Sequence, residues 1–121
     1  MKKNLLFLML GMLFLIGSLP IKAQEKDSYL GNWSFEAPTA PDGYTWGIIT
    51  FKKDSSFMKF TDGNYKYPSD WLKVNNDSIK YQTNVDGEIV LFSLRIIDKV
   101  KVTGNAVWSY GETLMILTKK E

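Results

Sequence analysis

Hydrophobic and polar residues alternate along most of the chain from Tyr29 onward. The clearest example is the segment 79–85, where Ile79, Tyr81, Thr83 and Val85 alternate with polar residues. A period of two is typical of half-buried strands, and turn residues recur at the spacing of about 8–12 residues found in sandwiches and barrels. No stretch beyond Tyr29 has a convincing helical period. The pattern therefore predicts an all-β domain of short antiparallel strands.

Turn residues divide this domain into eight predicted strands. They cover 32–37, 44–53, 56–61, 65–67 with 71–74, 79–85, 90–96, 100–110 and 113–120. Asp86-Gly87 is a strong hairpin turn because both residues tolerate positive φ, and Pro68 predicts a bulge or an edge in the fourth strand. Short loops make the strands a meander, and closing a meander removes its two open edges. We expect an antiparallel eight-stranded meander barrel, with a two-sheet β-sandwich as the alternative.

The N-terminus has the order of a secretory signal peptide. A short basic start precedes the apolar run Leu5–Leu19, and the small residue Ala23 follows. This run is shorter than the roughly 20 residues of a membrane span, so we predict a signal peptide at 1–23, with an uncleaved anchor as the alternative. Residues 24–29 are then a flexible segment and 30–121 the barrel domain. A cleaved chain with no cysteine for a lipid anchor and no further membrane span is expected in the periplasm or outside the cell.

Charge argues against nucleic-acid binding. The full chain has 15 Lys and Arg against 13 Asp and Glu. The predicted signal peptide contains Lys2, Lys3 and Lys22 and no acidic residue, which leaves 12 basic and 13 acidic side chains in the mature chain. No basic stripe remains to contact phosphates.

Histidine and cysteine are both absent from the sequence. Their absence excludes Ser-His-Asp and Cys-His nucleophile systems, and zinc, haem or copper sites built on these ligands. A hydrolase that uses a pair of carboxylates is the remaining enzymatic alternative. Most acidic residues fall in predicted turns, where turn chemistry accounts for them. We therefore predict a protein that is not an enzyme and has no cofactor and no metal.

Gly31-Asn32-Trp33, at the start of the first predicted strand, resembles the Gly-x-Trp opening of lipocalin and calycin barrels. The strand count and order also resemble those of short secreted bacterial lipocalin-like proteins. The resemblance implies that Trp33 lies across the closed end, with a basic residue of the last strand over its ring. Lys119, or alternatively Lys120, stands at that place, so Gly31, Trp33 and Lys119 are the predicted closure residues. The chain departs from the family in having Lys where Arg is usual, and in its shorter barrel.

Six aromatic residues occupy positions predicted to face inward. They are Trp33, Phe35, Phe51, Phe60, Phe92 and Trp108. The lumen of an eight-stranded barrel is either just filled by side chains or holds one small ligand. Because the strands are short and these side chains bulky, we expect a filled or nearly filled lumen.

A second aromatic set supplies the candidate binding residues. Tyr44, Trp46 and Ile48 share one face of the second predicted strand, opposite the core face of Ile49 and Phe51. The irregular fourth region contributes three more, Tyr65, Tyr67 and Trp71. Large amphipathic rings on a surface often mark a binding site, the alternative being that a loop or a neighbouring chain covers them.

The sequence thus predicts an exported, non-enzymatic binding module. Its expected ligand is a small apolar molecule at the barrel mouth. The alternative is a protein-binding module, such as a hydrolase inhibitor or an envelope accessory, that uses an exposed aromatic face. An open lumen would favour the ligand and a filled lumen the protein partner. Nothing in the sequence predicts an oligomeric state.

Overall fold

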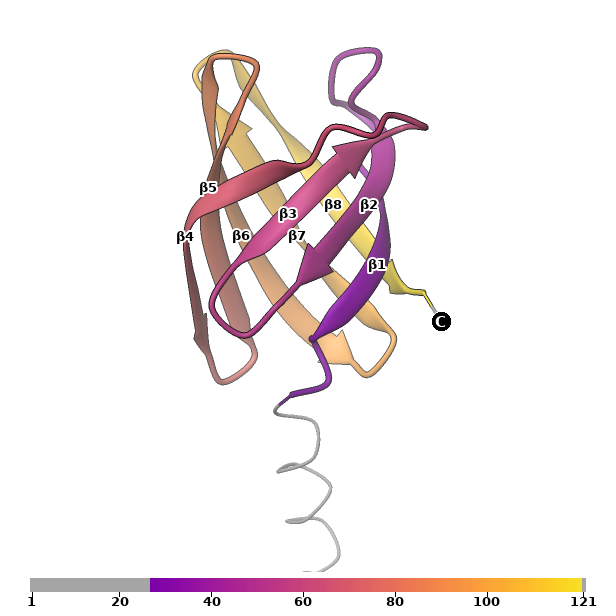
Figure 1. Ribbon diagram of the computed structural model, residues 1–121, viewed down its shortest axis with the longest axis vertical. Coiled ribbons are helices and arrows are strands. Elements are labelled where there is room, and N and C mark those ends of the chain that lie inside the picture. Colours follow the sequence, from indigo (N-terminus) through magenta and orange to yellow (C-terminus); the bar gives the residue numbers. More distant parts are fainter. Residues whose placement is uncertain (1–26, 121) are drawn as a thin grey trace, which may run out of the picture.

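The computed structural model describes residues 27–120, and these form a closed antiparallel barrel. Each strand pairs with the next along the chain, and the last pairs with the first (Figure 1). The strands are β1 (Gly31–Glu36), β2 (Trp46–Phe51), β3 (Ser56–Phe60), β4 (Tyr67–Asn75), β5 (Ser78–Val85), β6 (Glu88–Asp98), β7 (Lys101–Trp108) and β8 (Gly111–Lys119). The predicted all-β, eight-stranded meander barrel is confirmed, and the β-sandwich is excluded.

Two sequence predictions concern residues outside this range. The signal peptide 1–23 and its cleavage after Ala23 lie outside the described residues, as do 24–26 and Glu121. Within 27–120, no helix is long and apolar enough to cross a membrane.

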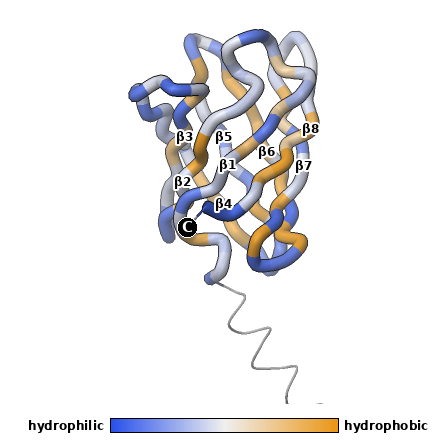
Figure 2. The backbone as a smooth tube through the Cα atoms, turned by 90° about the vertical axis from the view of Figure 1, so that its right-hand side faces the viewer, coloured by the Kyte–Doolittle hydropathy of each residue, from blue (hydrophilic) through white to orange (hydrophobic). Residues whose placement is uncertain are grey.

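Alternation places one set of side chains inside the barrel and the other in solvent. On β5, Ile79, Tyr81, Thr83 and Val85 are all buried, as their spacing predicts. The hydropathy colours in Figure 2 alternate along the strands for the same reason. Some strand ends differ from the prediction, because the segment before Trp46 and the segment after Trp108 turn away as loops. The fourth strand, predicted in two pieces, is continuous from Tyr67 to Asn75.

The pairing of β3 with β4 is the shortest in the barrel. It joins Phe57 with Pro68 and Met58 with Tyr67, and no further pair follows. Beyond Pro68 the register of β4 against β5 shifts between Ser69 and Trp71, which confirms the irregularity predicted there. We call this contact between β3 and β4 the seam.

One end of the barrel is closed by Trp33, which is fully buried. Its indole Nε1 donates a hydrogen bond to the Tyr29 carbonyl (2.8 Å), and Lys119 Nζ lies 4.9 Å from the ring centroid. Lys119 also donates to the carbonyls of Ser28 (2.9 Å) and Leu30 (2.5 Å). This clamp of Trp33, Lys119 and the three carbonyls ties the first strand to the last.

Gly31 adopts a backbone conformation that suits glycine, and it lies directly beside the clamp. Its φ is +114°, a conformation that L side chains rarely adopt. A Cβ at this position would lie 3.3 Å from Lys119 Nζ. The glycine that opens β1 therefore allows the lysine to cross over Trp33.

Residues 27–29, at the end of the segment 24–29 that is predicted to be flexible, lie against the closed end of the barrel. The Tyr29 side chain is 6% exposed, and its ring meets Phe51 edge to face at 6.0 Å. The Leu30 N–H donates to the Asp27 carbonyl (3.2 Å), which turns the chain beneath the barrel. The polar run that suggested a loose segment thus ends before Tyr29, whose ring completes the closed end.

Candidate functional site

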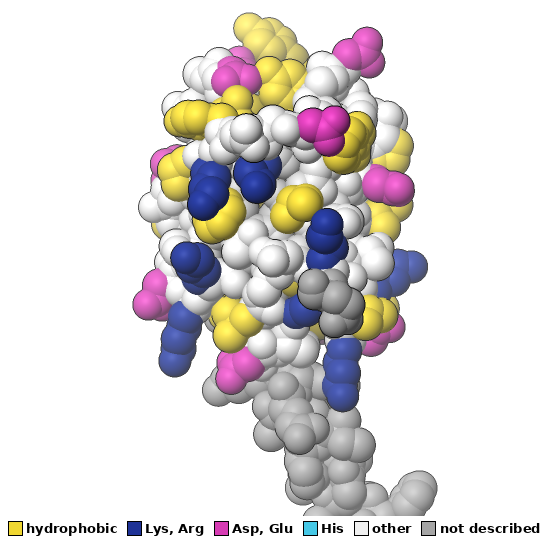
Figure 3. Space-filling model, turned by 45° about the vertical axis from the view of Figure 1, so that its right-hand side comes forward, with side chains coloured by type: hydrophobic (Ala, Val, Ile, Leu, Met, Phe, Trp, Pro, Cys, Tyr) yellow, Lys and Arg dark blue, Asp and Glu magenta, His cyan; other side chains and the backbone are white. Residues whose placement is uncertain are grey.

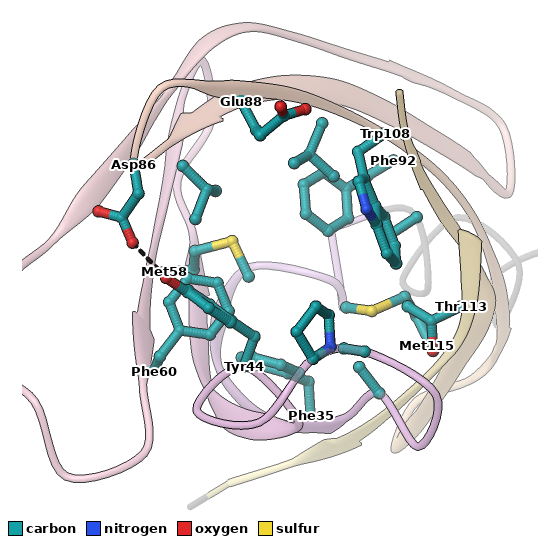
Figure 4. Close-up of a pocket in the computed structure, with 16 residues that line it drawn as sticks. Phe35, Tyr44, Met58, Phe60, Asp86, Glu88, Phe92, Trp108, Thr113 and Met115 are labelled. Carbon is teal, nitrogen blue, oxygen red and sulfur yellow. Dashed lines mark hydrogen bonds between the residues drawn. The ribbon is translucent and has the colours of Figure 1, made fainter. Parts of the chain in front are cut away.

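The opposite, open end of the barrel contains a pocket of about 220 Å³ (Figure 4). It is lined by Phe35, Ala37, Ala40, Pro41, Tyr44, Met58, Phe60, Val85, Asp86, Glu88, Val90, Phe92, Ala106, Trp108, Thr113 and Met115. The expectation of a filled lumen therefore holds only for the closed half. There the inward positions carry Trp33 and Tyr81, whereas the small residues Ala37 and Ala106 line the pocket in the open half.

The pocket has a buried apolar floor. Phe35, Met58, Phe92 and Met115 are each 1–3% exposed and close it from below. Phe92 stacks on Tyr81 beneath it, with ring centroids 4.4 Å apart and planes 7° from parallel. A ligand that reached this floor would meet carbon and sulfur atoms rather than water.

The loop between β1 and β2, residues 37–45, forms one side of the opening. The Ala37 N–H donates to the Thr45 carbonyl (2.7 Å), and the Thr39 N–H donates to Thr113 Oγ1 on β8 (3.1 Å). These bonds hold the loop against the barrel, so that Ala40 and Tyr44 line the pocket.

Asp86 joins three parts of the open end. It occupies the β5–β6 hairpin with φ 53°, followed by Gly87 with φ 94°, as the Asp-Gly turn predicts. Its carboxylate accepts hydrogen bonds from the hydroxyls of Tyr44 (2.5 Å) and Tyr67 (2.8 Å). This tyrosine–aspartate bridge, made of Tyr44, Asp86 and Tyr67, connects loop 37–45 and β4 to the hairpin.

The bridge shifts the ionisation of all three groups. Hydrogen bonds from Tyr44 and Tyr67 lower the pKa of Asp86 below its usual value, because they stabilise the carboxylate. The same bonds raise the pKa of Tyr44, and that of Tyr67 to about 12. Asp86 is therefore ionised, and both tyrosines are neutral donors, across the neutral pH range.

The barrel interior also contains buried hydroxyls. Tyr81 OH, Thr83 Oγ1 and Ser56 Oγ are buried without a hydrogen-bond partner, and burial raises the pKa of Tyr81. Within residues 27–120 there is no group of three or more acidic, histidine or cysteine side chains that could hold a metal ion.

The six predicted binding residues do not form one surface. Tyr44 and Tyr67 meet at the open end through the bridge. Trp46 and Trp71, each 45% exposed, lie on the outer wall on β2 and β4, and Ile48 follows Trp46 on β2, where it is half-buried. Tyr65, 66% exposed, packs on Tyr67 with ring centroids 4.5 Å apart.

The prediction that Tyr44 shares a face with Trp46 and Ile48 is wrong. β2 begins at Trp46, so strand alternation does not extend back to Tyr44. The chain turns at Gly43, whose φ is +92°, and this turn directs the Tyr44 ring onto Phe60 at 4.9 Å.

No family model, no curated protein and no solved structure matches this chain. The likeness to lipocalin-type barrels therefore rests on the chain itself. The Gly-x-Trp opening, the closed eight-stranded meander and the basic residue over Trp33 are all consistent with such a barrel.

Sequence reasoning missed the two carboxylates of the pocket. The position of Asp86 in a predicted turn accounted for its presence, and Glu88 comes before the sixth predicted strand, which starts at Val90. The period of two nevertheless puts Glu88 in phase with Val90 and Phe92. A carboxylate at an inward-facing position is unusual, and it was the available signal for a polar rim. Glu88 Oε1 accepts a hydrogen bond from the Ser109 hydroxyl (2.8 Å).

Proposed function

We propose that this protein is an exported, non-enzymatic binding module that takes a small, largely apolar ligand into its open end. The observation that carries the proposal is the pocket of about 220 Å³ with its buried apolar floor. Ligand sites are typically concave and mostly apolar, with a few polar groups that fix orientation. The half-buried Tyr44, Phe60 and Trp108 supply the walls, and Asp86 and Glu88 supply the polar groups.

The pocket volume bounds the size of the ligand. An apolar cavity of about 150 Å³ binds benzene, so this pocket suits a single ring with a short chain, on the order of ten non-hydrogen atoms. A ligand of that size gains a few kcal/mol from buried apolar area and loses part of this gain to association entropy. We expect a dissociation constant on the order of 1 mM.

Export is supported by the residues of the N-terminal segment. A basic start, an apolar run and Ala23 in the expected order favour cleavage and release into the periplasm or beyond. Intact-mass measurement of the exported protein tests this proposal. A mature chain starting at Gln24 is the expected result, and a membrane-bound species that retains 1–23 would contradict it.

The binding proposal is tested by blocking the pocket. Ala40→Phe adds a ring at a pocket-lining position of loop 37–45, whereas Pro38→Phe adds the same ring at an exposed position of that loop. NMR titration of 2-phenylethanol, followed through the Trp108 indole signal, should show saturable binding in the wild type and in Pro38→Phe. Binding should be lost in Ala40→Phe. Equal binding by both variants, or none by the wild type, contradicts a ligand in this pocket.

A protein-binding role is the second candidate because Trp46 and Trp71 are both 45% exposed on the outer wall. Large exposed rings are frequent anchors of protein interfaces. In this case a captured partner should be lost by Trp46→Ala and retained by Ala40→Phe. The ligand proposal predicts the opposite sensitivity.

A further inference from the structure

Charge is segregated along the barrel axis. Among the described residues, the loops of the open end and the two outermost residues of each adjoining strand carry six carboxylates and two lysines: Glu36, Asp42, Asp62, Asp86, Glu88 and Glu112, with Lys59 and Lys66. By the same criterion the closed end carries six basic residues and four carboxylates: Lys52, Lys53, Lys99, Lys101, Lys119 and Lys120, with Asp27, Asp54, Asp77 and Asp98. Figure 3 shows this on one face, where the end away from the grey segment displays acidic but not basic side chains.

The charged residues that line the pocket are also acidic. Asp86 and Glu88 are its only charged lining residues within the described chain, and both are acidic. They come from the two sides of the β5–β6 hairpin and lie at the rim in Figure 4, above the apolar floor. A ligand seated in the pocket therefore has carbon around its body and negative charge beside the end that faces solvent.

The carboxylates retain acceptor capacity. Each oxygen of Asp86 accepts one tyrosine hydrogen bond, and a carboxylate oxygen has two lone-pair sites. The tyrosine bonds also keep Asp86 ionised, so that its charge does not depend on the ligand. Glu88 is oriented by Ser109, whose hydroxyl donates a hydrogen bond to its Oε1.

Aromatic faces complete this environment. The indole of Trp108 lies across the opening from Asp86 in Figure 4, and Tyr44 lies on a third side. A cation near the face of a tryptophan or tyrosine ring is attracted by the ring quadrupole. Carboxylates and ring faces together favour a positive group and disfavour a negative one.

We propose that the ligand of this pocket is an organic cation: a primary amine on a single ring or short apolar chain, with the ring on the floor and the ammonium between Asp86, Glu88 and Trp108. This inference rests on the proposed ligand-binding function and adds the charge of the ligand. The same charges disfavour fatty acids and other anionic amphiphiles.

Three matched probes test it on the mature protein. 2-Phenylethylamine, 2-phenylethanol and phenylacetate share a ring and eight carbons and differ in charge. At low salt we expect the amine to bind about tenfold more tightly than the alcohol. A partly exposed ion pair and a cation–π contact each add modestly to the binding free energy. Phenylacetate should bind more weakly than the alcohol. Because the charges are partly exposed, high salt should bring the amine and alcohol affinities together.

Charge-removing variants locate the effect. Asp86→Asn with Glu88→Gln should bring the ratio of amine to alcohol affinity close to one, since asparagine tolerates the positive φ of position 86. Asp54→Asn removes one carboxylate at the closed end and should leave the ratio as in the wild type.

The outcomes separate the two proposals. If the alcohol binds but the amine binds no better, or phenylacetate binds best, the cation inference is overturned and the ligand-binding function stands. If no probe binds, both are overturned. An amine preference that survives the double variant, or that Asp54→Asn removes equally, also overturns the inference, because the charge would then act from elsewhere.

Discussion

The two ends of this barrel follow the same alternation of inward and outward residues, yet one is solid and the other hollow. At the closed end the inward positions hold Trp33, Phe51 and Tyr81, all fully buried. At the open end Ala37 and Ala106 leave the space that becomes the pocket. The size of the inward side chains, rather than the number of strands, thus decides whether this part of the lumen is filled.

Each end is also held together by one charged side chain, and the two side chains have opposite charge. Lys119 closes one end, with its ammonium over an indole and bonded to carbonyls of residues 28 and 30. Asp86 organises the other, with its carboxylate bonded to two tyrosines. The lysine lies among backbone groups and stabilises the fold, whereas the aspartate is exposed at a rim where a ligand can reach it.

The largest expected difference is between two inward tryptophans. Trp33→Ala should lower the free energy of unfolding by about 3–5 kcal/mol, the usual loss for a buried aromatic. Trp108→Ala should cost about 1–2 kcal/mol, because Trp108 is half-buried beside a pocket and gives up fewer contacts. Urea melts of both variants measure the difference.

Trp46→Ala provides the control on the outer wall. Trp46 is 45% exposed, so its loss should change stability by about 0.5 kcal/mol or less. Equal losses for Trp33 and Trp108 would refute the contrast between a solid and a hollow end.

A smaller effect tests the clamp through adjacent lysines. Lys119→Met removes two hydrogen bonds to carbonyls and the cation over Trp33, and should cost about 2 kcal/mol. Lys120→Met should be nearly neutral, because Lys120 is exposed and its backbone N–H, which the substitution keeps, donates to the Asn32 carbonyl (2.9 Å). The thermal midpoints of the two variants give the comparison. A loss at Lys120 as large as at Lys119 would mean that the clamp is misassigned.

Tyr81→Phe should make the solid end more stable. The Tyr81 hydroxyl is buried without a hydrogen-bond partner, and such a group costs desolvation energy that phenylalanine avoids. We expect a gain of up to about 1 kcal/mol in chemical denaturation, with the stacking on Phe92 retained. A loss would show that the hydroxyl has a partner in solution, such as a buried water.

The smallest effect concerns pH at the hollow end. The pKa of Asp86 is lower in the folded protein than in the unfolded chain, where it is about 3.9. Asp86 therefore stabilises the fold above about pH 3.9, and this stabilisation is lost as pH falls through the pKa of the folded state. The pKa of Tyr67 is raised from 10.0 to about 12 on folding. Tyr67 therefore stabilises the fold below pH 10, and this stabilisation is lost as pH rises through about 12. Both groups are near solvent, so the change in free energy is small.

Ultraviolet titration of tyrosine ionisation detects the bridge directly. In Asp86→Asn the pKa of Tyr67 should fall from about 12 toward 10, because the hydrogen bond to Asp86 is the main cause of its shift. A titration curve identical to that of the wild type would show that the bridge does not form in solution.

The fold was largely predictable from sequence, because strand alternation and turn residues are local signals. β5 and the Asp86-Gly87 hairpin show this well, as does the irregularity after Pro68. Loop 37–45 was not predictable. Its course depends on contacts with Thr113 and Asp86, which are distant in sequence, and the strand pattern therefore placed Tyr44 on the wrong face.

The site was predictable only in outline. A ligand at the barrel mouth was expected, but the volume of a pocket depends on which inward residues are opposite one another after closure. Ala37 and Ala106 line the same pocket although they belong to the first and last thirds of the chain. The roles of Asp86 and Glu88 likewise require the closed barrel, because neither carries a local motif beyond its turn.

The clamp sets an order of events during synthesis. Lys119 is 89 residues from Leu30, whose carbonyl it binds, and β1 is made long before β8. Until the last strand arrives, Trp33 has no cation above it and β1 has a free edge that other chains can pair with. Closure over such a sequence separation is slow compared with hairpin formation. The newly made chain therefore exposes the edge of β1 until β8 has emerged, and pairing of β8 with β1 ends that exposure.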